Sequence, residues 1–194
     1  MEHEPLHPII VKESSIESFD SYLSRPYIGE ILRKRLSEAN ALIIPNEGYD
    51  NRSDLVYFPS GTEDLYQFLK DKNVGGLNLD ACIEDKDYKE VALHADWLIL
   101  AGFLVTELVA PLIVALLAEY IKKRLGKRES ETIVKARLII RENKDGHYAE
   151  YKYEGPASEY REAMTNAISK VGNPKSPAAV DRHELKQHHH RNKH

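Results

Sequence analysis

Hydrophobic residues are unevenly distributed along the chain, and one segment concentrates them. Residues 97–118 contain a single charged side chain, Glu107, together with one Thr, one Gly and one Pro. As a helix, a segment of this length would span about 33 Å at 1.5 Å per residue. The pattern therefore predicts a long central apolar helix that continues to about residue 121. A helix that is apolar on all sides must also be covered on all sides.

Shorter apolar patterns surround this segment and predict a small mixed sheet with several shorter helices. Apolar runs that end at a proline predict buried strands at residues 41–44 and 55–58, and the alternation over residues 77–83 predicts a half-buried strand. Stripes of apolar residues at spacings of three and four predict helices at residues 26–39, after Ser60-Gly61-Thr62-Glu63, and after Ser158.

A β-hairpin is predicted near the C-terminus. Residues 132–141 and 147–153 are rich in Ile, Val, Thr and Tyr, and they flank the turn Asn143-Lys144-Asp145-Gly146. Asp-Gly between two such runs favours a tight reversal. The fold class expected from these patterns is α+β: a small mixed sheet with a C-terminal β-hairpin, packed on the long apolar helix.

Charge divides the chain into two parts. The 194 residues have a formal net charge of −4, but residues 171–194 contain five basic and two acidic side chains, which leaves −7 for the preceding 170. Five of the nine histidines also lie in this last part, which has too few large apolar residues to form a core. We therefore predict one α+β domain over residues 1–172 and a flexible, basic, His-rich tail over residues 173–194.

Composition also limits the function and location of the protein. A single cysteine, Cys82, excludes an intramolecular disulfide framework and suits a reducing compartment, so we expect a cytoplasmic protein. Mild acidity disfavours specific nucleic-acid binding. The apolar segment is long enough to cross a bilayer, and cations follow it, but Glu107 and Pro111 oppose a spanning helix. Membrane association through residues 97–121 stays open as an alternative.

Covering the apolar helix completely is demanding for a chain of this size, so we expect a homo-oligomer or a protein partner. Within such a core, Glu107 would need a partner or a proton. The side chains expected at the partner or assembly interface lie on or next to the apolar segment; they are Trp97, Phe103, Glu107, Pro111 and Tyr120.

Several groups of polar residues are candidate enzyme or metal sites. Acidic side chains after a predicted strand (Asp80, Glu84, Asp85 and Asp87) could bind Mg²⁺ in a metal-dependent hydrolase or nuclease, although a solvated charged loop is the simpler explanation. The same two interpretations apply to Glu47, Asp50, Arg52 and Asp54. His94 with Asp96 is more simply structural, and the tail histidines would bind metals only adventitiously. We expect no catalytic residue, metal or cofactor.

From residue 62 onward the order of elements resembles a known family. A short helix (Thr62-Glu63-Asp64-Leu65-Tyr66-Gln67-Phe68-Leu69), a strand, an apolar helix, the Asp145-Gly146 hairpin and a closing helix are similar to the effector-associated constant component proteins of bacterial conflict systems. The resemblance covers residues 62–170 and depends on pattern rather than on a residue motif. It implies a non-enzymatic adaptor in bacterial defence or signalling, with no catalytic residues to carry over.

Overall fold

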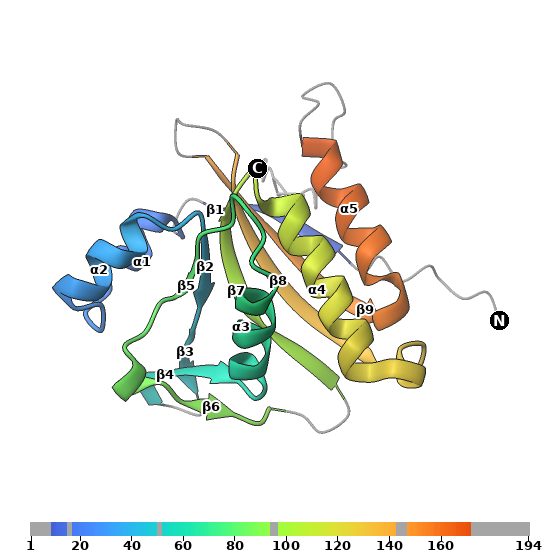
Figure 1. Cartoon of the computed structure of the whole chain (residues 1–194), viewed down its shortest axis with the longest axis horizontal. Coiled ribbons are helices and arrows are strands. Elements are labelled where there is room, and N and C mark those ends of the chain that lie inside the picture. The colour runs from blue at the N-terminus through green and yellow to red at the C-terminus, as the bar shows by residue number, and fades with distance from the viewer. Residues whose placement is uncertain (1–8, 15–16, 50–51, 94–96, 143–146, 172–194) are drawn as a thin grey trace, which may run out of the picture.

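The structure, a computed structural model, describes residues 9–14, 17–49, 52–93, 97–142 and 147–171. A six-stranded sheet with the strand order β1-β9-β8-β7-β2-β5 forms its centre (Figure 1). Neighbouring strands are antiparallel except in the parallel pairs β2–β5 and β7–β8. The strands are β1 (Ile9–Ser14), β2 (Ala41–Ile44), β5 (Leu79–Ala81), β7 (Trp97–Thr106), β8 (Ile133–Arg141) and β9 (Tyr148–Pro156).

A smaller sheet lies beside the first and has the order β3-β4-β6. It consists of β3 (Asn46–Tyr49), β4 (Arg52–Pro59) and the short β6 (Glu90–Val91). β4 and β6 are parallel, with Phe58 opposite Glu90. This pairing holds β6 next to the start of the helix that follows β4.

Helices cover both faces of the large sheet, and each face has its own core. α3 (Thr62–Asp71), α4 (Ala110–Leu125) and α5 (Tyr160–Val171) pack on one face around a main core that includes Phe103, Ile113 and Tyr151. α1 (Phe19–Leu23) and α2 (Glu30–Ser37) cover the other face through a smaller core. Short 3₁₀ turns lie at Asp85–Asp87, Gly126–Arg128 and Ala157–Glu159.

The prediction of one long apolar helix over residues 97–121 is wrong. The segment forms β7, a turn at residues 107–109, and then α4. β7 lies between β2 and β8, and its side chains from Leu100 to Val105 are buried. A strand buried on both faces is apolar at nearly every position, and a helix covered on all sides has the same composition. Pro111 lies in the first turn of α4, where a proline is tolerated, instead of interrupting a helix.

The α+β class and the C-terminal hairpin are confirmed. β8 and β9 pair antiparallel over their whole length, from Ile133 opposite Pro156 to Arg141 opposite Tyr148. The turn at residues 143–146 and the tail at residues 173–194 lie outside the described residues. Within the described part of the chain, no helix has the length and apolar character needed to cross a membrane.

Candidate functional site

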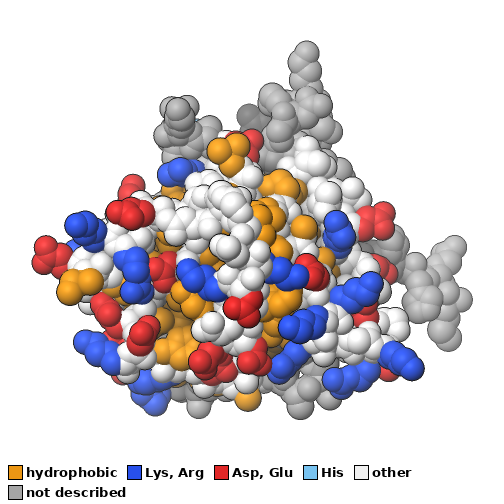
Figure 2. Space-filling view, viewed as in Figure 1, with side chains coloured by type: hydrophobic (Ala, Val, Ile, Leu, Met, Phe, Trp, Pro, Cys, Tyr) orange, Lys and Arg blue, Asp and Glu red, His pale blue; other side chains and the backbone are white. Residues whose placement is uncertain are grey.

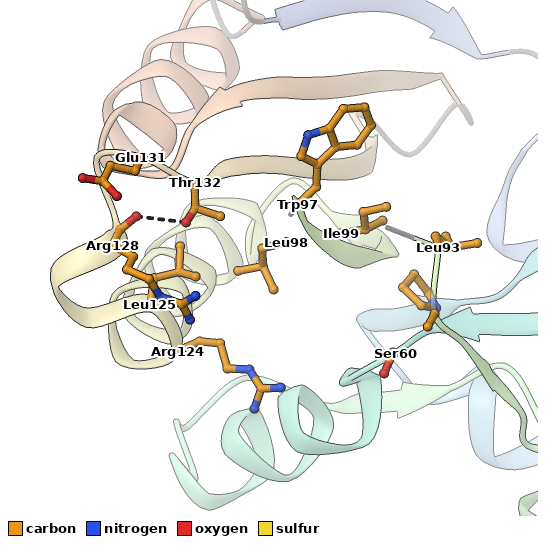
Figure 3. Close-up of a pocket in the computed structure, with 12 residues that line it drawn as sticks. Ser60, Leu93, Trp97, Leu98, Ile99, Arg124, Leu125, Arg128, Glu131 and Thr132 are labelled. Atoms are coloured by element: carbon orange, nitrogen blue, oxygen red, sulfur yellow. Dashed lines mark hydrogen bonds between the residues drawn. The ribbon is translucent and has the colours of Figure 1, made fainter. Parts of the chain in front are cut away.

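An open groove lies where the C-terminal end of α4 meets the beginning of β7. It has a volume of about 500 Å³. Figure 3 shows side chains from several segments around it: Leu98 from β7, Arg124 and Leu125 from α4, and Ser60 from the turn before α3. Leu93 and Arg128 also line it. We call this feature the α4-end groove.

One wall of the groove is fixed by an unusual start to α3. Gly61 is the N-cap residue and has a φ of 89°, a left-handed conformation that favours glycine. The carboxylate of Glu90 accepts hydrogen bonds from the backbone N–H groups of Gly61 and Glu63, both at 2.8 Å, and from the hydroxyl of Tyr88 at 2.6 Å. Ser60 donates its N–H to the carbonyl of Val91 at 3.1 Å. Strand β6 therefore positions both Ser60 and the start of α3.

The Glu90 carboxylate is held in its charged form. Burial by itself would raise the pKa of Glu90, but the hydrogen bonds from Tyr88 and from the backbone outweigh burial and lower it. The positive end of the α3 dipole favours the same charged state. An anion therefore already occupies this helix N-terminus, and that anion belongs to the protein.

The other wall joins α4 to α3. Arg124 forms an ion pair with Asp64 at 3.1 Å, and the hydroxyl of Tyr120 donates to the carbonyl of Gly61 at 3.3 Å. Burial raises the pKa of Tyr120, so its hydroxyl stays a donor. A second hollow between α3 and α4 shares Arg124 as a lining residue. Arg124 therefore stands between two depressions on this surface.

Basic side chains concentrate around the groove. Five of the seven residues from 122 to 128 are Lys or Arg, and all five are exposed. Figure 2 shows basic side chains gathered over the end of α4. Cations at a helix C-terminus are favourable by themselves, because they oppose the negative end of the dipole. Their density also gives the rim of the groove a positive potential.

The described lining of the groove is mixed in chemical character. It combines the apolar side chains of Leu93, Leu98 and Leu125 with the guanidinium groups of Arg124 and Arg128, the hydroxyls of Ser60 and Thr132, and the carboxylate of Glu131. Guanidinium groups stay protonated in proteins, so they donate hydrogen bonds and do not transfer protons. A carboxylate or another planar anion is the group that they bind best.

Of the five predicted interface residues, two lie at or near this groove. Trp97 lines it and is 37% exposed, and the ammonium group of Lys135 lies 3.9 Å from the centre of its ring. Figure 3 shows the indole directed away from Arg124. Tyr120 is almost fully buried behind the groove and lines its narrow continuation with Ser60 and Arg124.

The other three lie elsewhere. Phe103 is fully buried in the main core. Glu107 and Pro111 are exposed beyond the opposite end of β7, about 30 Å from Trp97 along the strand. The expectation that Glu107 needs a partner inside a core is wrong, because the residue follows the strand instead of lying within a buried helix. The structure thus brings Trp97 and Tyr120, which one helix would have held about 35 Å apart, to the region of one groove, and it leaves the other three residues elsewhere.

Two of the acidic residues considered as metal ligands form ion pairs with arginine. Asp80 pairs with Arg35 at 2.5 Å, and Glu47 pairs with Arg25 at 2.9 Å and accepts from the hydroxyl of Tyr27 at 2.6 Å. No group of three or more His, Cys, Asp or Glu within the described ranges is placed to bind a metal ion. Asp50, His94, Asp96 and the tail histidines lie outside those ranges.

The lining residues Ser60, Leu93, Leu98, Arg124 and Arg128 were not predicted as a site. The density of cations at residues 122–128 is visible in the sequence, but it suits a helix C-terminus or the flank of a membrane span and does not by itself indicate a groove. The other residues come from segments whose proximity depends on the β4–β6 and β2–β7 pairings. Such long-range pairings leave no local mark in a sequence.

Comparison with known proteins identified no relative. No family model matched the chain, and neither did any curated protein or solved structure.

Proposed function

We propose that the protein is a non-enzymatic interaction component, an adaptor, and that it binds a segment of a partner protein in the α4-end groove. The observation that supports this most directly is the composition of the groove: an apolar floor of Leu93, Leu98 and Leu125 beside an arginine rim. Peptide segments are commonly bound by such a combination, in which apolar contacts supply affinity and charged contacts supply orientation.

The resemblance to effector-associated constant component proteins implies an adaptor, but it depends on the order of elements, and the long apolar helix in that order is β7 and α4 in the structure. A place in a bacterial defence or signalling system depends on that resemblance alone and stays a prediction. The runner-up, a metal-dependent hydrolase, finds no cluster of metal ligands in the described part of the chain to support it. The helix that a membrane-associated effector was expected to use is instead β7 and α4.

Selection from a displayed library of random twelve-residue peptides tests the proposal. The full chain is the bait, and its Leu93→Ser variant is used for counter-selection. Leu93 belongs to neither core, so this change should leave the fold intact. We expect peptides that bind at micromolar concentration and lose at least fivefold in affinity for Leu93→Ser and for Arg128→Gln.

A control variant distinguishes binding in the groove from binding elsewhere on the surface. Lys127→Gln is the matched control, because Lys127 is adjacent to Arg128 and exposed but does not line the groove. If no peptide is enriched, or if every enriched peptide binds the wild type and both groove variants equally, the groove is not a docking site and the proposal fails.

Self-association is a separate proposal. Leu108 is 91% exposed, and it lies near the exposed Pro111, one of the predicted interface residues, in the region that joins β7 to α4. We propose that a homo-oligomer would use this apolar tip. Sedimentation velocity of the wild type and of Leu108→Ser tests this proposal. A concentration-dependent dimer that Leu108→Ser weakens supports it. A wild-type protein that stays monomeric over a 100-fold range of concentration up to about 0.5 mM overturns it.

A further inference from the structure

Arg128 differs from its neighbour Arg124 in what it contacts. One nitrogen of Arg124 is engaged by Asp64 at 3.1 Å. The guanidinium group of Arg128 forms no ion pair with any described residue. Its backbone carbonyl accepts from the hydroxyl of Thr132 at 2.9 Å and from the backbone N–H groups of Glu131 and Thr132, both at 3.1 Å. Arg128 is exposed and lines the groove. It is therefore a charged donor available at the rim.

The surroundings of Arg128 reinforce its preference for an anion. Lys122 and Lys127 are exposed and also form no ion pair within the described structure, and Lys123 lies over the ring of Phe68. The acidic residues Glu129 and Glu131 follow, and Glu131 lines the groove together with Arg128, but residues 122–131 still keep a net charge of +3. A positive rim beside apolar side chains strengthens the attraction for an anion, because the local dielectric constant is lower than in water.

The second anion-binding device near the groove is already filled. The N–H groups of Gly61 and Glu63 at the start of α3 point to the Glu90 carboxylate. A phosphate would therefore find no free helix N-terminus here and would have to be bound by arginine alone. A carboxylate needs fewer hydrogen-bond donors than a phosphate, since one guanidinium group can bind both of its oxygens.

The apolar floor further limits which ligands fit the groove. Leu98 and Leu125 are partly buried and pack against the main core, so they form a fixed apolar surface within the same groove as Arg128. A free inorganic anion would leave this surface unused. A segment that has an apolar side chain near a carboxylate would use both.

On the basis of the proposed function, we infer that the groove binds an acidic, amphipathic peptide segment of a partner protein. An aliphatic or aromatic side chain of the segment lies on the floor of Leu98 and Leu125, and a nearby Asp or Glu pairs with Arg128. The chain's own residues 171–194 have a net charge of +3, so electrostatics disfavours them as the occupant.

Fluorescence polarisation with defined probes tests this inference. The probes are ten-residue fluorescein-labelled peptides of Ser and Gly with a central Leu or Phe and a Glu one to four positions away, each paired with a version in which Gln replaces Glu. We expect at least one Glu probe to bind and its Gln version to bind about fivefold more weakly, the upper end for an exposed ion pair. Arg128→Gln should abolish this difference, and Lys127→Gln should change the affinity less than twofold.

The outcomes separate the inference from the function on which it depends. If Gln probes bind as well as Glu probes and Leu93→Ser still weakens both, the acidic partner is wrong and the docking function survives. If neither these probes nor library peptides bind in a groove-dependent manner, both fail. If millimolar inorganic phosphate or a short single-stranded RNA displaces the Glu probes while binding more tightly itself, the inference is overturned in favour of a phosphate ligand.

Discussion

Glu90 is a capping residue that lies far along the chain from the helix it caps. Replacing it with Gln should destabilise the protein by about 0.5–1 kcal/mol at pH 7, at the lower end of capping energies because the carboxylate is exposed. The folded-state pKa of Glu90 is lowered, so its contribution is present above the unfolded pKa and is lost as the pH falls through the folded value. Urea unfolding at pH 7 and pH 3 measures both effects, and an equal difference at both pH values would contradict the account.

The same helix shows what local sequence reasoning misses. Ser60, Thr62 and Glu63 are residue types that often cap a helix, but the N-cap residue of α3 is Gly61, and it has no side-chain cap. Thr62 donates its hydroxyl to the carbonyl of Pro59 at 2.6 Å. The residue types were consistent with a helix start, and the helix does begin at Thr62. The identity of the cap depended on the β4–β6 pairing, which no local pattern predicts.

Arg137 on β8 supports a second test at the scale of a residue. It pairs with Glu150 at 2.6 Å and with Glu17, and Glu150 is only 9% exposed. Burial would raise the pKa of Glu150, but its pairing with Arg137 lowers it. Arg137→Gln should cost about 1–3 kcal/mol, less than a fully buried pair because Lys152 still contacts Glu150 at 3.3 Å.

The double variant Arg137→Gln/Glu150→Gln provides the control, since it removes the unpaired charge as well. It should regain part of the lost stability at pH 7 in chemical denaturation. Because the pKa of Glu150 is lowered in the folded state, the cost of Arg137→Gln should shrink as the pH falls below about 4. A double variant less stable than the sum of the single changes would contradict this explanation.

At the scale of elements, the segment from residue 97 to residue 118 shows where the sequence was ambiguous. A central strand buried on both faces and a helix covered on all sides have the same apolar composition, and periodicity does not separate them. Gly102 and Pro111 were the available clues: a glycine inside the run and a proline suited to a first helical turn. The hairpin of β8 and β9 was predictable because its turn and its β-branched residues are local features.

Gly102 also explains how tightly β7 packs against its neighbour. A Cβ atom at this position would lie 2.9 Å from Cγ1 of Ile44, and that side chain is itself buried in the smaller core. Gly102→Ala should therefore destabilise the protein by about 1–3 kcal/mol through overpacking. Gly75 is the matched control, since a Cβ there meets nothing within 4 Å and its φ is not positive. Thermal unfolding measures the melting temperature of both variants. An equal decrease for Gly102→Ala and Gly75→Ala would refute the packing argument.

At the scale of the whole molecule, the two faces of the sheet are covered unequally. The main core joins three helices to the sheet, whereas the smaller core joins only α1 and α2 to β2, β7, part of the hairpin and Cys82, which follows β5. Less apolar surface is buried on the side of α1 and α2, so this layer should open at a lower free energy than the rest. This difference in stability between the two layers was not predictable from the sequence, because α1 and α2 have ordinary amphipathic patterns and only the packing shows how little surface they bury.

Cys82 offers a direct measurement of that opening. The thiol is fully buried in the smaller core with Leu36, and burial raises its pKa, so reagents such as DTNB should reach it only when the α1–α2 layer separates from the sheet. Labelling in native buffer should be faster than global unfolding allows. Leu36→Ala should accelerate it at least 20-fold through its loss of about 2–4 kcal/mol from the smaller core. Leu117→Ala in the main core should lower global stability by a similar amount with little change in labelling. If both variants accelerate labelling in proportion to their global destabilisation, the two layers unfold as one cooperative unit.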